Sequence, residues 1–269
     1  MTRRGVTLVE LIITLVVFGI LGTALARLMI SNSRFVSQQE MQLEARQTAR
    51  AAMNVVLPEL RMVSDSGLLA AARDSVRVRV PYAFGVFCRN DYVVLAPPDS
   101  AVYATAQPAG IAYQLASGLY GFNPTVTVTG LTTNTADCDA DSVRAIPGGL
   151  RLQLSVANLA PAGRLFYLYQ VVTYRFANST ALPGRRALWR QADGAAAEEI
   201  LAPFDTAARF VFLVGSRLLP QLTVPAQLSS IRGLEIRLVG ASVSSAQGES
   251  EPTRFALHPR VRFGNMLVP

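Results

Sequence analysis

The first apolar pattern in the chain is one long N-terminal block. From Val6 to Ala26 the residues are apolar apart from threonines, two glycines and the single charge of Glu10. As an α-helix that rises about 1.5 Å per residue, this block spans about 31 Å and matches a bilayer core of about 30 Å. Arg3 and Arg4 precede it, and positive charge on that side places the N-terminus in the cytoplasm. We therefore predict a membrane helix over residues 6–29.

Three kinds of N-terminal segment fit this block. A secretory signal peptide fits because Ala24-Leu25-Ala26 offers an A-x-A cleavage site, although its apolar region is usually only about 7–15 residues long. An uncleaved anchor fits by length, and so does a leader that is cut before the apolar run. Glu10 separates them, because a carboxylate inside a membrane helix costs about 2.5–3.5 kcal/mol and has no role in the first two kinds.

The residues around Glu10 resemble the N-terminal signature of the type IV pilin and pseudopilin family. That signature is a short basic leader, a glycine, a phenylalanine-like residue, Thr-Leu, an aliphatic residue and glutamate. The corresponding residues here are Gly5, Val6, Thr7, Leu8, Val9 and Glu10. The resemblance implies cleavage by prepilin peptidase between Gly5 and Val6, N-methylation of Val6, and a glutamate at mature position five. Val6 stands where phenylalanine or methionine is usual.

Cleavage at this site would also give Glu10 a physical role. It creates a terminal amine on Val6, about one helical turn before Glu10. A buried carboxylate needs a cationic partner, and in a filament the terminal amine of a neighbouring subunit can supply it. We therefore expect Glu10 to set the axial register of assembly while the apolar face of the helix drives packing.

Helical periodicity continues beyond the membrane block. An apolar stripe with spacings of three or four residues predicts an amphipathic helix over residues 30–66. Pro58 is expected to kink or break it, and Ser64-Asp65-Ser66-Gly67 to end it. A dimeric coiled coil is one way to cover the stripe, but the stripe is short and irregular, so we expect packing on the chain's own head. The stripe consists of Ala45, Ala49, Met53, Val56, Leu60 and Val63.

From residue 74 the apolar period changes to two, which is typical of half-buried strands. Residues 165–176 and 186–191 are expected to form a hairpin, because the segment between them holds Asn178, Pro183 and Gly184. No repeated βαβ pattern is visible, so the sheet should be mostly antiparallel. The other predicted strands cover 75–80, 92–95, 125–128, 150–156, 187–190, 210–214 and 234–239.

Several motifs in the head are similar to those of W-type minor pilins and of J-type minor pseudopilins of type II secretion. The resemblance rests on a Tyr-Arg pair, a turn, an apolar-Trp-Arg run, an acidic stretch and a following strand, together with the end of the long helix. Pro58 departs from the Leu-x-x-Asp-Leu-Arg pattern at that helix end. The matching segments are 174–176, 188–190, 198–200, 209–212 and 57–61.

The two cysteines, Cys88 and Cys138, cannot form a zinc site, which needs four ligands at short spacing. If the chain is exported, an oxidising compartment favours a disulfide between them. In the chain-entropy model, closing that loop would stabilise the fold by about 4 kcal/mol. The alternative is that both are small buried hydrophobic residues.

Three aspartates, Asp137, Asp139 and Asp141, alternate in one segment, as they do at the start of a calcium loop. Ser142 stands where an EF-hand loop has its glycine, and Gly148 stands where it has its bidentate glutamate. The default interpretation is therefore a solvated loop anchored by Cys138, with a calcium site as the alternative.

Charge and motifs weigh against nucleic-acid binding and catalysis. The formal net charge is +7, but the arginines are scattered and form no basic patch with interleaved aromatics. The chain has no nucleophile elbow, Walker loop, dinucleotide fingerprint or H-E-x-x-H motif, and its one histidine, His258, is expected to be structural. Glu198 and Glu199 are adjacent, so they do not form a general acid–base pair and are expected at a solvated loop edge. We expect no cofactor and no enzymatic activity.

Together these patterns predict an α+β protein with a long N-terminal helix packed on a mostly antiparallel β-sheet. Its segments are a leader over residues 1–5, a membrane helix over 6–29, an amphipathic continuation over 30–66 and a periplasmic β-rich head over 67–269. We expect a minor pilin or minor pseudopilin that is anchored in the inner membrane and assembles into the tip or priming complex of a type IV pilus or a type II secretion pseudopilus.

The partners expected for such a subunit are other pilin or pseudopilin subunits, prepilin peptidase, the inner membrane and its assembly platform. Two alternatives stay open. One is a periplasmic binding protein held by an uncleaved anchor, and the other is a secreted enzyme released after Ala26. The mature N-terminus distinguishes all three.

Overall fold

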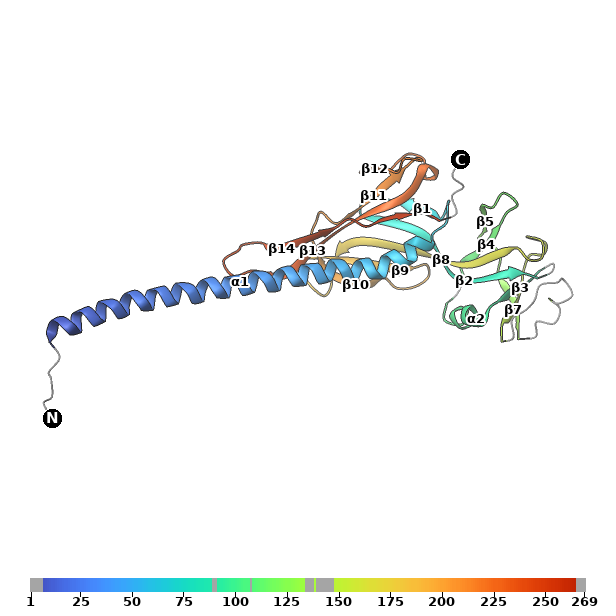
Figure 1. Ribbon diagram of the computed structural model, residues 1–269. Helices are drawn as coiled ribbons and strands as arrows, with labels where there is room; N and C mark the ends of the chain where they lie inside the picture. The colour runs from blue at the N-terminus through green and yellow to red at the C-terminus, as the bar shows by residue number, and fades with distance from the viewer. Residues whose placement is uncertain (1–6, 89–90, 107, 134–137, 139–147, 265–269) are drawn as a thin grey trace.

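The computed structural model describes residues 7–88, 91–106, 108–133, 138 and 148–264. It confirms the predicted α+β fold, because one long helix, α1 (Leu8–Met62), lies along an antiparallel β head (Figure 1). The other elements are β1 (Leu68–Ala71), β2 (Ser75–Phe87), β3 (Tyr92–Leu95), α2 (Pro97–Tyr103), β4 (Gly110–Gln114), β5 (Tyr120–Asn123), β6 (Val128–Thr132), β7 (Leu150–Leu154), β8 (Leu165–Asn178), β9 (Arg186–Ala192), β10 (Glu198–Phe204), β11 (Arg209–Val214), β12 (Leu219–Gln221), η1 (Leu228–Ser230), β13 (Ile231–Ser245), β14 (Pro252–Leu257) and β15 (Arg260–Arg262).

The helix α1 runs unbroken through Pro58, so the predicted break of the helix at that residue is wrong. Pro58 removes only the hydrogen bond to the Asn54 carbonyl, and both residues lie on the exposed side of the helix, where water can hydrogen-bond that carbonyl. The helix ends at Met62, just before the predicted turn, where Val63 becomes extended and Ser66 adopts a φ of 62°.

The predicted apolar stripe of α1 packs against the chain's own head, as expected. Ala45, Ala49 and Leu60 are fully buried, and the helix contacts β13, β14 and β10. The contact is close because small residues face each other. A Cβ at Gly240 of β13 would lie 2.3 Å from the Ala45 carbonyl oxygen. Alanine and glycine thus allow the helix backbone to rest directly on the strand.

All strand pairings of the sheet are antiparallel, in the order β12-β11-β13-β10-β9-β8-β2-β3-β7-β6. The predicted hairpin is confirmed, since β8 pairs β9 up to Asn178 and Arg186. The strand expected over 125–128 is misplaced, because β6 begins only at Val128. The Asn123 side chain accepts hydrogen bonds from Thr125 N at 3.1 Å and Thr125 Oγ1 at 2.8 Å, and this turn delays the strand.

Two long strands, β2 and β8, connect two hydrophobic cores. In the proximal core, Val76, Val172 and Tyr174 pack with the buried face of α1 and with β10, β11 and β13. In the distal core, Phe87 and Phe166, from the other ends of the same strands, pack with β3, β7 and β4. We call these parts the proximal and distal lobes, and the distal lobe lies beyond the end of α1 (Figure 1).

Candidate functional site

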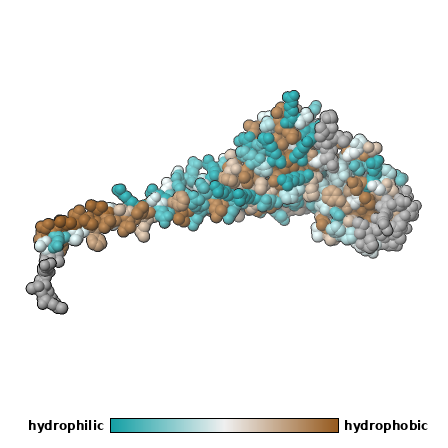
Figure 2. All heavy atoms as spheres, in the orientation of Figure 1, coloured by the Kyte–Doolittle hydropathy of each residue, from teal (hydrophilic) through white to brown (hydrophobic). Residues whose placement is uncertain are grey.

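The N-terminal part of α1 is an apolar rod that the rest of the chain does not cover. Leu8, Phe18 and Met29 are each 76% exposed, and the first fully buried residue of the helix is Ala45. Figure 2 shows the outer part of this rod as a mostly hydrophobic surface that projects from the head. In the part of the chain that the structure describes, α1 is the one helix long and apolar enough to cross a membrane.

Glu10 lies at the start of this rod and is bound within its own helix. Thr7 is the N-cap, and its hydroxyl accepts the Glu10 N–H at 3.3 Å. The Glu10 carboxylate in turn accepts the Thr7 N–H and the Thr7 hydroxyl, both at 3.2 Å. This capping box satisfies helix donors that would otherwise lack partners in an apolar environment.

The sequence interpretation missed this role of Thr7, although the spacing Thr-x-x-Glu before an apolar run signals a capping box. Gly5 and Val6, the predicted cleavage and methylation residues, lie outside the described residues.

The head begins to brace the helix well before the first buried residue. Ser33 Oγ donates to Gln247 Oε1 at 2.8 Å, and Gln247 N donates to Ser37 Oγ at 3.0 Å. Gln247 lies on the connection between β13 and β14, and Ser244 of β13 contacts Met41 Sδ at 3.5 Å. The tip of this hairpin therefore fixes the direction in which the apolar rod leaves the head.

The segments that carry the head resemblance meet at the junction of helix and sheet. Tyr174 of β8 donates its hydroxyl to Glu59 of α1, and Arg190 of β9 forms a salt bridge with Glu59 at 3.2 Å. On the opposite face of the same strand pair, the Arg175 guanidinium lies 5.6 Å from the centre of the Trp189 ring. The contact of Tyr174 and Arg190 with Glu59 thus ties the helix end to two strands.

Burial and charge act together at this junction. Burial raises the pKa of Tyr174, and the neighbouring Glu59 carboxylate raises it further, so the tyrosine stays a hydrogen-bond donor. For Arg190, burial lowers the pKa, but Glu59 and Tyr174 more than offset that effect and the net shift is upward. The Glu59 carboxylate therefore has two donors that keep their protons.

Glu199 has a different environment from the predicted solvated loop edge, because it lies in β10. Its carboxylate accepts the Ser179 hydroxyl, the Thr180 N–H and hydroxyl at 2.7 Å, and the Ala181 N–H at 3.4 Å. Burial opposes ionisation, but these donors lower the pKa of Glu199 to about 2. Glu199 thus organises the β8–β9 turn. A pattern of two adjacent glutamates could not indicate this, since the donors come from another strand connection.

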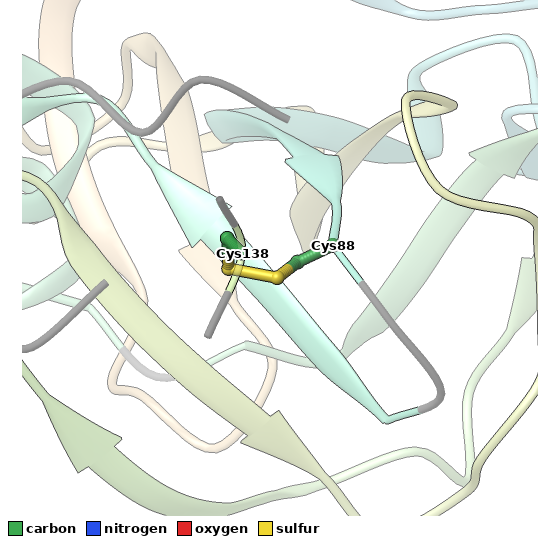
Figure 3. The surroundings of a disulfide bond; sticks show 2 residues. All are labelled: Cys88 and Cys138. Carbon is green, nitrogen blue, oxygen red and sulfur yellow. A yellow bond between two sulfur atoms is a disulfide. The ribbon is translucent and has the colours of Figure 1, made fainter. Parts of the chain in front are cut away.

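Cys88 and Cys138 are joined by a disulfide, with a Cα–Cα distance of 5.0 Å (Figure 3). Both are fully buried and pack with Val94 of the distal lobe.

The calcium alternative at Asp137, Asp139 and Asp141 lies outside the described residues. Within the described ranges, no group of three or more His, Cys, Asp or Glu side chains could hold a metal ion. His258, expected to be structural, is exposed in the short connection between β14 and β15.

Comparison with known proteins finds a family motif in the N-terminal segment, which includes the start of the apolar rod. Residues 1–26 match the family described as the prokaryotic N-terminal methylation motif. Searches among curated proteins and among solved structures gave no match. The apolar helix and the motif fit a membrane-anchored protein whose head lies outside the cytoplasm.

Within that class, the motif and the long helix support the resemblance to type IV pilins over the N-terminal segment of the chain, residues 1–26. The motif implies processing by prepilin peptidase and assembly with other pilin subunits.

Proposed function

We propose that the protein is a minor pilin or minor pseudopilin, a structural subunit rather than an enzyme. The observation that supports this most directly is the uncovered rod. Large hydrophobic side chains from Leu8 to Ile30 remain exposed, and Glu10 sits at their start. A bilayer covers such a surface before assembly, and the helices of neighbouring subunits cover it afterwards. The motif over residues 1–26 supports the same interpretation.

The position we propose is the tip or priming complex of a type IV pilus or a type II secretion pseudopilus. Two observations support a minor rather than a repeating subunit. The head after the helix is large, with two hydrophobic cores. Its Tyr174, Arg190 and Glu59 contact is built from the motifs that are similar to W-type minor pilins and J-type minor pseudopilins.

Processing in this proposal occurs in the inner membrane, between Gly5 and Val6, and is followed by N-methylation of Val6. The Glu10 carboxylate, bound to Thr7 in the single chain, would then pair with the terminal amine of a neighbouring subunit. The assembly platform in the inner membrane would supply the neighbouring helices. The head would remain in the periplasm or on the filament surface.

Mass spectrometry of the mature N-terminus tests the processing step. We expect an N-methylated Val6 as the first residue. Intact Met1 would instead support a periplasmic binding protein held by an uncleaved anchor. A chain that begins at Arg27 would support a secreted protein and would contradict the proposal.

The substitution Glu10→Ala tests the register role. We expect cleavage and head folding to be unchanged. Assembly should fall at least about a hundredfold, because leaving a buried amine without its partner costs about 3–5 kcal/mol. The measurement is the fraction of protein in sheared filaments or in cross-linked complexes with other pilin subunits.

The matched control is Glu40→Ala, on an exposed turn of the same helix outside the apolar block. Equal assembly of the two variants would show that Glu10 does not set the register.

A further inference from the structure

The distal lobe contains an apolar cavity of about 360 Å³, which lies within the size range of pockets that bind small ligands. It opens where β2 and β8 pass the start of α2. We call it the distal cavity, and its principal lining residues are Phe84, Val86, Val94, Asp99, Tyr120 and Leu165.

The floor of the distal cavity is tightly packed backbone. A Cβ at Gly85 would lie 2.1 Å from the Val94 carbonyl oxygen and 2.6 Å from the Phe166 ring, so no larger residue fits there without a shift. Two wall residues are large and hydrophobic, yet Phe84 is 44% exposed and Leu165 is 49% exposed. Hydrophobic residues also show on the surface of the distal lobe in Figure 2. The cavity is thus a preformed apolar hollow that no side chain of the described chain fills.

Among the described residues that line this hollow, one is charged, and it is Asp99, whose carboxylate is half-buried. The pairing of β2 with β3 ends at Gly85 and Leu95, just before Pro97 and Pro98 at the start of α2. The Phe84 N–H lies next to this end of the pairing. Asp99 Oδ1 accepts that N–H at 2.9 Å, and this fixes the carboxylate at the cavity.

Asp99 can be compared with two other partly buried carboxylates of this fold, each of which has an arginine partner. Glu59 is paired with Arg190 and Asp65 with Arg232, both at 3.2 Å. Across the residues that the structure describes, no arginine forms a salt bridge with Asp99. A partly desolvated carboxylate is stabilised by a cation. The distal cavity therefore combines apolar walls with one carboxylate, that of Asp99, which could pair with a cationic group of a ligand.

We propose that the distal cavity binds an apolar side chain that stands next to a lysine or arginine, presented by an exposed segment of a partner protein. The apolar group would fill the space between Phe84 and Leu165. The neighbouring cation would pair with Asp99. A few anchoring side chains in such a hollow supply most of the binding energy in many protein interfaces. This site goes beyond the proposed function and does not depend on it, because it rests on the geometry of the head alone.

Fluorine NMR on the full chain in lipid nanodiscs tests the charge preference, with empty nanodiscs as background. The probes are para-fluorophenethylamine, para-fluorophenethyl alcohol and para-fluorophenylacetate, which share one apolar body and differ in charge. We expect the amine to bind about three- to fivefold tighter than the alcohol, as for a partly exposed ion pair, and the acetate to bind weakest. Equal binding of amine and acetate overturns the proposal, and this comparison needs no variant.

Two variants then locate the probe. Asp99→Asn keeps an oxygen for the Phe84 N–H and should remove the preference for the amine while leaving alcohol binding within about twofold. Leu165→Ala shortens one wall and should weaken all three probes. The matched controls are Glu249→Gln and Leu219→Ala, an exposed carboxylate and an exposed leucine away from the cavity. If Leu165→Ala changes binding no more than Leu219→Ala does, the probes bind elsewhere and the proposal fails.

A final arm distinguishes a protein partner from a free small molecule. Two flexible Gly-Ser peptides carry a central para-fluorophenylalanine followed by either arginine or glutamate. We expect the arginine peptide to bind at least as tightly as the free amine, and the glutamate peptide to bind about three- to fivefold more weakly than the arginine peptide. Binding of the amine without binding of the arginine peptide would overturn the assignment of a protein segment as the ligand.

Discussion

At the scale of single residues, carboxylates hold the parts of this protein together. Glu59 binds α1 to β8 and β9, Asp65 binds the end of the helix to β13, and Glu199 binds β10 to the β8–β9 turn. Glu59 and Glu199 each accept several donors in a partly desolvated position, where the loss of one partner leaves the others unsatisfied. Asp65 accepts one donor group, the Arg232 guanidinium, through both of its oxygens. Their stabilisation therefore exceeds that of an exposed ion pair.

The contact at Glu59 should respond differently to two substitutions. Glu59→Ala leaves Arg190 and the buried Tyr174 hydroxyl without their acceptor, so we expect the free energy of unfolding to fall by about 1–3 kcal/mol. Glu59→Gln keeps one acceptor and should lose less. Urea unfolding followed by the fluorescence of Trp189, the one tryptophan of the chain, measures both. A loss no greater than that of Glu40→Ala would show that the contact is not stabilising.

Glu199 should make stability depend on acid in a defined range. Its folded-state pKa of about 2 lies below the ordinary value of 4.5. The stabilisation is therefore fully present above about pH 4.5 and is lost as the pH falls towards about 2. The stability difference between the native protein and Glu199→Gln should thus be constant from pH 7 to about 4.5 and shrink below that.

The neighbouring Glu198 is the control for that titration, because it is exposed on the same strand. The Glu198→Gln variant should show a smaller change in the same urea experiment. A difference for Glu199→Gln that stays constant down to about pH 2 would contradict the role of its four hydrogen bonds.

At the scale of elements, long periodic segments could be predicted from the sequence and short ones could not. The stripe of α1 and the alternation at the start of β2 each extend over several repeats, and β8 is a long apolar run, so these segments are clear in the sequence. The strand β12 has three residues and contains Pro220, while β14 begins at Pro252. Proline is tolerated at an edge strand such as β12 and at the first residue of a strand such as β14. These two strands form because they pair with neighbouring strands, and the local sequence pattern does not indicate them. Likewise, no sequence pattern indicates the distal cavity, since its walls come from separate strands.

The close contact between α1 and β13 gives a prediction for an element as a whole. Gly240→Val would place atoms within 2.3 Å of the Ala45 carbonyl, so the helix must move away from the strand. We expect the free energy of unfolding to fall by about 1–3 kcal/mol, as in other overpacked contacts.

Hydrogen exchange should rise first in the helix near Ala45 and Ala49. Gly118→Val, in an open turn with a φ of 82°, is the control for backbone strain without a packing clash. If helix exchange rises equally in both variants, the packing explanation is wrong.

At the scale of the whole molecule, β2 and β8 carry one sheet through two cores, while the disulfide belongs to the distal lobe alone. Local damage in the distal lobe should therefore leave the junction of helix and head intact. This separation could not be predicted from the sequence, because the predicted strand over 75–80 covers only the proximal part of β2, and β8 is a single apolar run through both lobes.

Replacing both Cys88 and Cys138 by serine tests that separation. The bond closes a sequence separation of 50 residues, and in the chain-entropy model its loss destabilises by about 4 kcal/mol. We expect proteolysis and hydrogen exchange to increase in β3 and β7 while Trp189, at the proximal junction, keeps its fluorescence. Equal loss of protection in both lobes would show that they unfold as one unit.

The hairpin tip that hydrogen-bonds Ser33 and Ser37 also sets the clearance between head and lipid. Ser33 follows Met29, the end of the predicted membrane helix, by four residues, or about 6 Å of helix. The headgroup layer of one leaflet is about 5–7 Å thick. With residues 6–29 in the bilayer core, the head would therefore begin at the outer edge of the headgroup layer. It can turn there only together with its helix, so the orientation of the helix in the membrane decides which side of the head a neighbour meets.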